Sequence, residues 1–167
     1  GGVNFCVYAK RAARVDLLLF DHPEDAAAQT IELDPAHNRS NDYWHVFVNG
    51  IGPGQLYGYR VSGPSKPGLR FDPTKLLVDP YTLAVANTEN YDRARAAAPG
   101  DNAATALKSV VVDPTQYDWE GDRPLRRPFI DSVIYEMHVA GFTKNPNSGV
   151  APEKRGTFAG LIEKIPY

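Results

Sequence analysis

Glu136 and His138 are the side chains whose types and spacing best suit acid–base chemistry. They stand two positions apart in an alternating segment, so a strand would place both on one face. One interpretation makes the glutamate an acid and the histidine its partner. The alternative is a buried, hydrogen-bonded pair that only holds the strand, and we favour it because buried polar groups usually satisfy one another. We therefore predict no catalytic residue in this chain.

Acidic residues between positions 113 and 131 could suggest a cation site. Calcium takes about six to eight oxygen ligands, often from a loop of regular spacing, and no such spacing occurs here. The four histidines also lack the spacing of zinc ligands. We expect turn and capping carboxylates instead, and predict neither a metal nor a cofactor. The carboxylates concerned are Asp113, Asp118, Glu120, Asp122 and Asp131.

Sugar binding is a third chemistry, because the apolar face of a pyranose ring stacks on flat aromatic side chains. Three aromatic residues are candidates for this role: Tyr43, Tyr57 and Trp119. Tyr43 and Tyr57 could face outward from a sheet, although a tyrosine in a sandwich more often packs. Trp44 alternates with apolar residues, so we predict that it lies in the core.

The elements that must position these side chains are strands within residues 1–86. Apolar residues alternate with polar ones there, which predicts strands with one buried face. The Gly52-Pro53-Gly54 turn predicts that 43–49 and 56–62 form an antiparallel hairpin. The fold class is mainly β, an immunoglobulin-like antiparallel β-sandwich. The residues that we expect to be mainly buried are Phe5, Leu17, Leu19, Trp44, Val46, Tyr59 and Val61.

Residues 87–131 differ in composition from the strands before them. They are first rich in alanine and then charged, aromatic and proline-bearing. Aromatic side chains are costly to leave in water, so we predict an ordered linker wrapped on the sandwich.

Residues 132–167 read as one strand followed by one helix. The strand, at 132–140, has apolar residues on both faces, as a parallel strand covered on each side does. Thr157 is a candidate N-cap for a helix over 158–165. A strand and a helix make one unit of a β/α barrel, which needs eight such units. We therefore expect a truncated barrel start, with the loop between 143 and 156 cut first by proteases. The predicted buried stripe of the helix is Leu161, Ile162 and Ile165.

Composition excludes two classes of partner. The net charge is −2, from 18 basic and 20 acidic residues that are mixed along the chain, so no basic stripe is offered to a nucleic acid. No run approaches about 18 consecutive apolar residues, so we predict no membrane segment. The one cysteine, Cys6, can form no internal disulfide, which fits a reducing compartment such as the cytoplasm.

Eight segments of the chain closely resemble the isoamylase and glycogen-debranching branch of the α-amylase superfamily, glycoside hydrolase family 13. The two most specific are long, irregular and rich in Pro, Asp and aromatic residues: RFDPTKLLVDPY at 70–81 and YDWEGDRP at 117–124. The others are GGVNF at 1–5, RVDLLLFD at 14–21, YWHVFV at 43–48 with PGQLYGYRVSGP at 53–64, SVIYEMHVAGFT at 132–143 and RGTFAGLIEKIP at 155–166.

The resemblance implies a domain division and an activity. Residues 1–86 are similar to the family's carbohydrate-binding module of family 48, 87–131 to its linker, and 132–167 to the first strand and helix of its catalytic barrel. The implied activity is hydrolysis of α-1,6 branch linkages in glycogen, amylopectin or limit dextrin. The catalytic carboxylates of the resembled enzymes come from later strands, which this sequence does not include. The glucan-binding relatives carry tryptophans in the loop after the second strand, whereas DHPEDAAA stands at 21–28.

Three hypotheses follow. In the first, the chain is a non-catalytic N-terminal fragment of a debranching glycosidase, whose partners are an α-glucan and its own missing barrel domain. In the second, it is a stand-alone α-glucan-binding module. In the third, it is a docking or structural sandwich without a ligand. The barrel-like end favours the first, and the missing loop tryptophans favour the third over the second.

Overall fold

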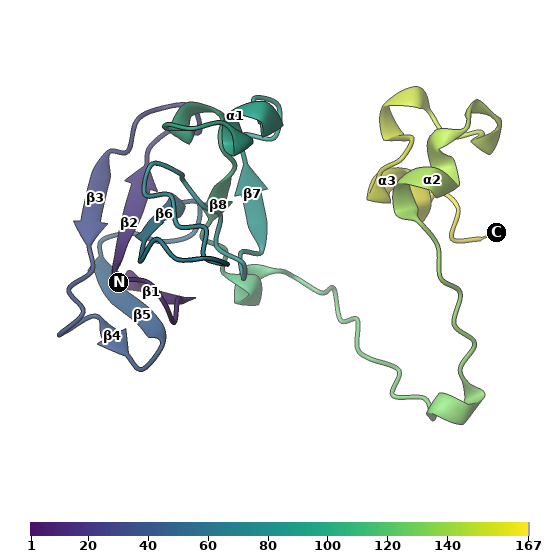
Figure 1. Cartoon of the computed structure of the whole chain (residues 1–167). Helices are drawn as coiled ribbons and strands as arrows, with labels where there is room; N and C mark the ends of the chain where they lie inside the picture. Colours follow the sequence, from purple (N-terminus) through teal and green to yellow (C-terminus); the bar gives the residue numbers. More distant parts are fainter. Residues whose placement is uncertain (167) are drawn as a thin grey trace. The chain divides into compact units, whose positions relative to one another are not determined.

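The computed structural model describes residues 1–166. The chain divides into two compact units, Gly1–Asp118 and Trp119–Tyr167, and each is described by itself (Figure 1). Within the described residues, no helix is long and apolar enough to cross a membrane.

Two antiparallel sheets build the first unit (Figure 1). The smaller sheet has the strand order β1-β5-β4, and the larger has the order β3-β2-β6-β8-β7. Both sheets are mainly formed by residues before 87, so the predicted antiparallel sandwich is confirmed. The strands are β1 (Gly2–Tyr8), β2 (Arg14–Phe20), β3 (Gln29–Glu32), β4 (Arg39–Ser40), β5 (Tyr43–Asn49), β6 (Leu56–Ser62), β7 (Ala84–Ala86) and β8 (Lys108–Val110).

The main core lies between the two sheets. Alternation places Phe5 and Trp44 of the smaller sheet against Leu17 and Tyr59 of the larger one, and all four are buried. Val46 and Val61 pack against this cluster but are only partly buried. The core prediction is therefore confirmed at Phe5, Leu17, Leu19, Trp44 and Tyr59.

The predicted hairpin of 43–49 with 56–62 is wrong, because β5 and β6 lie in different sheets. β5 pairs with β1 and β4, whereas β6 pairs with β2 and β8. The connection carries the chain from one sheet to the other, with glycines at positive φ at 50 and 54. It is held by a hydrogen bond from the Gly54 N–H to the Val111 carbonyl, 2.9 Å, which a tight hairpin would not need.

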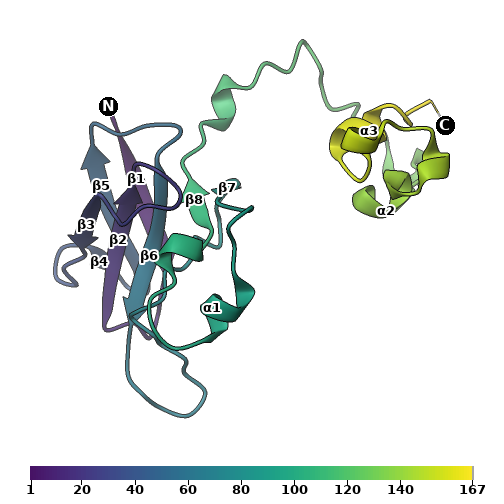
Figure 2. The same ribbon diagram turned by 90° about the horizontal axis from the view of Figure 1, so that it is seen from above.

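A second apolar cluster covers the outer face of the larger sheet. Leu18 and Phe20 of β2 pack there against Leu76 and Ala106. The chain between β7 and β8 includes α1 (Arg93–Ala97), which Figure 2 shows on the side of β6 and β8. This half of the predicted linker is ordered on the sandwich, because β8 is itself a strand of the larger sheet.

Two lysines hold the segments that cover the outer face of the larger sheet through hydrogen bonds to backbone carbonyls. The Lys75 amine donates hydrogen bonds to the carbonyls of Arg95, at 3.0 Å, and Gly100, at 2.7 Å, as well as to Ala98. Lys108 is fully buried and donates to the carbonyls of Ala103 and Ala106. Carbonyl partners of this kind compensate the burial of an ammonium group.

The second unit contains short helices and 3₁₀ turns, without a strand among its described residues. The predicted strand at 132–140 is wrong for this chain, since residues 133–138 have no regular structure and α2 (Val139–Lys144) follows them. A parallel strand needs neighbours to pair its backbone groups, and none is present among the described residues. The 3₁₀ turns of the chain are Ala103–Thr105, Pro114–Gln116, Phe129–Asp131, Pro146–Ser148 and Pro152–Lys154.

The predicted helix is confirmed as α3 (Phe158–Ile162), with Thr157 as its N-cap. The Thr157 hydroxyl accepts a hydrogen bond from the Gly160 N–H at 3.2 Å. The predicted buried stripe is wrong at Ile162 and Ile165, which are 63% and 76% exposed. The helix packs against α2 on its Gly160 side, where Leu161 is partly buried, whereas Phe158 and Ile162 face water.

Candidate functional site

Tyr43, one of the predicted sugar-stacking residues, lies on the outer face of the smaller sheet. Its ring is 51% exposed and meets Tyr8 edge to face, with centroids 5.3 Å apart and planes at 68°. The antiparallel register of β1 and β5 places these two tyrosines directly opposite each other. Tyr8 is equally exposed, so the two rings form an open aromatic corner on the surface.

Polar groups lie next to this aromatic corner on the same face. The register continues it with Cys6 opposite His45, and the His45 Nε2 lies 3.0 Å from the Ser40 hydroxyl. Phe47 follows on the same side and is 57% exposed. We call the outer face formed by these residues the tyrosine face. Its members are Cys6, Tyr8, Ser40, Tyr43, His45 and Phe47.

Tyr57 does not face outward, so that expectation is corrected. It alternates with Tyr59 on the inner face of β6, is only 7% exposed and packs edge to face on Phe5. Its hydroxyl donates a 2.9 Å hydrogen bond to the Asp79 carboxylate. Burial, reinforced by that bond and by the negative charge, raises the pKa of Tyr57 to about 12. A ring in this position offers no free face to a sugar.

Trp119 belongs to the second unit and is 64% exposed. Its exposure is compatible with sugar stacking, but the structure does not bring it together with Tyr43 in one unit. No sugar is present to test the binding role of Tyr43, Tyr57 or Trp119, and that role stays a prediction.

The proposed buried pair of Glu136 and His138 is also corrected. Both residues are exposed, and the His138 Nδ1 accepts a hydrogen bond from the Gly141 N–H at 3.0 Å, which caps α2. The histidine therefore begins a helix and does not hold a strand. Across residues 1–166, no group of three or more His, Cys, Asp or Glu side chains could hold a metal ion.

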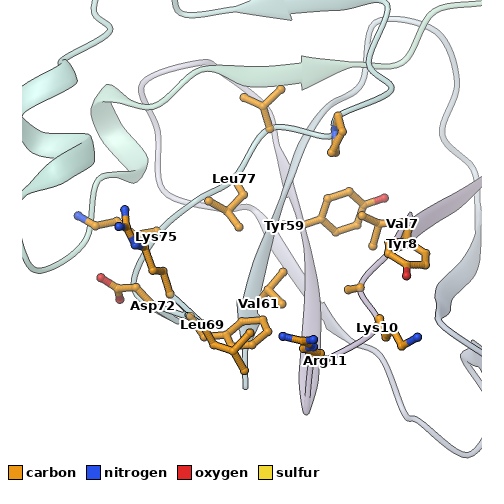
Figure 3. Close-up of a pocket in the computed structure, with 15 residues that line it drawn as sticks. Val7, Tyr8, Lys10, Arg11, Tyr59, Val61, Leu69, Asp72, Lys75 and Leu77 are labelled. Carbon is orange, nitrogen blue, oxygen red and sulfur yellow. The ribbon is translucent and has the colours of Figure 1, made fainter. Parts of the chain in front are cut away.

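A hollow of about 450 Å³ opens next to Tyr8 (Figure 3). One wall is the chain from Val7 to Arg11 at the end of β1, and the other is formed by residues 69–72 with 75, 77, 78 and 80. Tyr59 and Val61 of β6 lie between these walls (Figure 3). We call this hollow the Tyr59 cavity.

The Tyr59 hydroxyl is buried and has no hydrogen-bond partner among the described residues. Burial, and the negative charge of Asp79, raise the pKa of Tyr59 well above its usual range. The hydroxyl therefore stays protonated at neutral pH and keeps a proton to donate. No local sequence pattern predicts this cavity, since its walls come from segments about 60 residues apart.

An antiparallel sandwich that carries exposed tyrosines beside polar side chains has the kind of surface on which a carbohydrate-binding module stacks a sugar ring. Residues 1–82 match the family model of Carbohydrate-binding module 48 (isoamylase N-terminal domain), and this part of the chain belongs to that family.

Curated relatives match nearly the whole chain. Isoamylase 1, chloroplastic, of Oryza sativa subsp. japonica is 41% identical over 173 residues, which are 100% of this chain and 21% of that protein. The glycogen debranching enzyme of Yersinia enterocolitica is 42% identical over 168 residues, which are 96% of this chain and 24% of that protein. The chain thus spans about a fifth to a quarter of the length of these relatives.

Solved structures share the fold. A product complex of SpuA, a multi-modular glycogen-degrading pneumococcal virulence factor, has a TM-score of 0.70 at 24% identity. The match covers 99% of this chain and 17% of SpuA. A pullulanase from Bacillus acidopullulyticus has a TM-score of 0.62 at 24% identity, over 96% of this chain and 17% of the pullulanase.

Proposed function

We propose that this chain is the non-catalytic N-terminal part of an enzyme that hydrolyses α-1,6 branch linkages in glycogen or starch. The observation that carries the proposal is the extent of the match. It continues from the binding module through residues 87–131 and 132–167 into the relatives named isoamylase and glycogen debranching enzyme. A module that worked alone would share only its sandwich with such enzymes, not the segments after it. A cytoplasmic location remains our expectation, while the rice relative is described as chloroplastic.

The exposed apolar side chains of the second unit support the presence of a further domain that covers them. Ten large hydrophobic residues among its described residues are at least 60% exposed, although burying each one would stabilise the protein by about 1.5 to 3 kcal/mol. Further β/α units are the partner that we propose for this surface. These exposed residues are Trp119, Leu125, Phe129, Ile130, Val133, Ile134, Tyr135, Phe158, Ile162 and Ile165.

The chain's own contribution is to hold an α-glucan chain. We assign this to Tyr43, together with Tyr8, because their rings are exposed and stand at an angle that suits a curved glucan. Trp119 is a second proposed contact, and Tyr57 is left out because it is buried. Glycosidic hydrolysis needs two carboxylates about 5 to 9.5 Å apart over a bound sugar. We propose that such a pair is supplied by another part of the enzyme.

Native gel electrophoresis with and without glycogen in the gel tests the glucan-binding role. The chain should be retarded by glycogen, and Tyr43→Ala should remove most of the retardation. Tyr91→Ala is the matched control, because Tyr91 is also about half exposed, at 46%, but lies outside the tyrosine face. Equal retardation of all three proteins would contradict the role of Tyr43 and place glucan binding elsewhere on the chain, and retardation of none would leave the chain as a docking sandwich without a ligand.

A reducing-sugar assay on glycogen and pullulan tests the non-catalytic role. The chain should release no reducing ends above the buffer blank over several hours. Turnover that Glu136→Gln abolishes would contradict the proposal and make that residue catalytic.

A further inference from the structure

We propose that the open edge of β1 receives one further strand, formed by the residues that precede Gly1 in the full polypeptide. β1 stands at the end of the smaller sheet, whose order is β1-β5-β4, so no strand within residues 1–166 pairs with its other edge. This inference goes beyond the proposed function, because it depends neither on glucan binding nor on hydrolysis.

The register of β1 with β5 shows which backbone groups lie on the open edge. The Gly50 N–H donates to the Gly1 carbonyl at 2.9 Å, so these two residues form a hydrogen-bonded pair. Hydrogen-bonded pairs alternate along an antiparallel ladder. The odd-numbered residues of β1 therefore bond to β5, and the even-numbered ones point their N–H and C=O groups away from it. Asn4 and Cys6 lie at the middle of that outward row.

β1 lacks the features that protect the edges of most sheets. Exposed edge strands are usually short, charged, bulged or interrupted by proline, because an open row of N–H and C=O groups can pair with another extended chain. The other edge strands of this unit are short, since β4 has two residues, β7 has three and β3 has four. β1 has seven residues, GVNFCVY, with no charge, no proline and one-to-one pairing with β5. Such an edge is suited to a further strand.

A groove of about 280 Å³ lies beside this edge, and we call it the β1 groove. One wall is Val3–Cys6 of β1, and the other is formed by residues 81–83 and 110–112. The second wall includes Leu83 and Val112, which are 71% and 41% exposed. It therefore offers apolar contact to a chain that pairs with β1.

The larger sheet extends beyond β1 on the side of the groove. Phe5 of β1 meets Tyr57 of β6 edge to face, with ring centroids 4.9 Å apart, and β8 and β7 follow β6 in the larger sheet (Figure 2). Ser109 lies opposite both Tyr57 and Val85, so Val85 is on the same inner face as Tyr57. Val85 is nevertheless 42% exposed. A strand added to β1 would cover this part of the inner face.

The extension of the larger sheet leaves space for a single strand and not for a second copy of the sandwich. Antiparallel pairing between the β1 strands of two molecules would join their smaller sheets edge to edge. The β8 and β7 strands of both molecules, which extend beyond β1, would then project into the same space. A single extended segment brings no second sheet with it.

The residues before Gly1 are the segment best placed to fill the β1 groove. The Gly1 carbonyl is still bonded to Gly50, so the chain enters β1 at the end of the ladder. A turn of about two to five residues returns a preceding chain antiparallel along the open edge. Relatives of which this chain spans 24% and 21% extend well beyond it. A strand tethered in this way also has a high effective concentration, which a separate peptide lacks.

Amide exchange measured by NMR in D₂O tests the pairing. The 167-residue chain is compared with the same chain extended by the native residues, about 20, that its gene encodes before Gly1. In the 167-residue chain, the amides of Asn4 and Cys6 should exchange about 100-fold faster than that of Phe5, which bonds to β5. In the extended chain, both amides should slow by about that factor, and the Tm should rise by about 4 °C or more.

Asn4→Pro removes an N–H that the added strand would bond, and it leaves the hydrogen bonds to β5 intact. In the extended chain it should restore fast exchange at Cys6 and cancel most of the gain in Tm. Asn4→Thr is the matched control, because it keeps the N–H and should keep both effects.

Leu83→Asp tests the opposite wall of the groove and leaves β1 unaltered. Leu83 is 71% exposed, so the substitution should not change the Tm of the 167-residue chain. In the extended chain it should remove most of the gain in Tm, because a carboxylate would face the added strand. Tyr91→Asp is its control, since Tyr91 is 46% exposed and lies outside the β1 groove.

Three results would contradict the added strand. The first is fast exchange of Asn4 and Cys6 in both proteins with equal Tm values. The second is a gene that encodes no segment before Gly1. The third is slow exchange in the 167-residue chain itself, and a dimer in sedimentation equilibrium would then assign the edge to a second copy. Glycogen retardation and release of reducing ends are separate measurements, so each of these results leaves the proposed function unchanged.

Discussion

Replacement of Trp44 by alanine probes whether the sandwich is built as described. The indole is fully buried between the two sheets, and truncating such a side chain costs about 3 to 5 kcal/mol. The indole N–H also donates to the Ala9 carbonyl at 3.2 Å, a bond worth about 1 kcal/mol. The Arg39 guanidinium lies 5.1 Å from the ring centre, which adds about 0.5 to 1 kcal/mol.

These contributions give an expected loss of about 4.5 to 7 kcal/mol for Trp44→Ala. Single domains have unfolding free energies of only about 5 to 15 kcal/mol, so the variant should be barely folded at 25 °C. Urea unfolding followed by far-ultraviolet circular dichroism measures the change. Trp119→Ala is the control, because Trp119 is 64% exposed and its loss should cost less than about 1 kcal/mol. A loss below about 1 kcal/mol for Trp44→Ala, together with weaker retardation by glycogen, would refute the buried position and make Trp44 a sugar platform.

Three further predictions concern a buried hydroxyl, an ion pair and an exposed segment. Tyr57→Phe should lower the free energy of unfolding by about 1 to 3 kcal/mol, because the buried Asp79 carboxylate loses a hydrogen-bond donor. In the unaltered protein the pKa of Tyr57 is raised to about 12, so this contribution to stability should be full below pH 10 and lost as pH rises through 12. Unfolding at alkaline pH tests this dependence. Burial alone would raise the pKa of Asp101, but hydrogen bonds from the Ala103 N–H and from Arg60, 2.8 Å away, lower this pKa overall. The contribution of Asp101 to stability should therefore be present above about pH 4 and lost at lower pH. Asp101→Asn should flatten the acid unfolding curve, and an unchanged curve would contradict the pairing. Trypsin should first cut within 120–138, which is exposed and has a single 3₁₀ turn, and first cleavage within 143–156 would restore our sequence-based expectation.

The change in the expected protease site comes from contacts that no local pattern reveals. Asn145-Pro-Asn-Ser-Gly149 reads as an exposed loop, yet Val150 beside it is buried and the Ser148 hydroxyl donates to the Thr143 carbonyl at 3.0 Å. The Thr143 hydroxyl in turn accepts the Gly156 N–H at 2.8 Å. These bonds make 143–156 a compact turn, so the extended chain before it becomes the more accessible substrate.

Strands of the sandwich were predictable because each needs only one apolar face, and period-2 alternation encodes that face locally. Pairing was not predictable in the same way. The segment between β5 and β6 is short enough for a hairpin, but β5 pairs with β1 and β6 pairs with β2. The strand predicted at 132–140 does not form, since its pattern requires parallel neighbouring strands that the described residues do not provide.

The candidate site was predictable in part. Tyr43 was found because it alternates with buried Trp44, and the structure confirms that it is exposed. Tyr8 was missed although it alternates with buried Val7 in the same way, because its place opposite Tyr43 depends on the strand register. Tyr57 was misplaced although it stands two positions from Tyr59, whose predicted burial already marked that face of β6 as the inner one. The Tyr59 cavity depends on segments far apart in sequence, which only the folded chain brings together.

The size of the natural polypeptide tests the central proposal most directly. An antibody raised against residues 1–118, used on extracts of cells that express the gene, reports that size by immunoblotting. This chain has a mass of 18.4 kDa and covers 24% of the Yersinia relative and 21% of the rice relative. A full enzyme of the same organisation should therefore have a mass of about 77 kDa (18.4/0.24) to about 88 kDa (18.4/0.21). We predict one band in that range, and the immunoprecipitated material should release linear chains from glycogen by cutting α-1,6 linkages. A band near 18 kDa alone, in precipitates without debranching activity, would contradict the account and leave a stand-alone module.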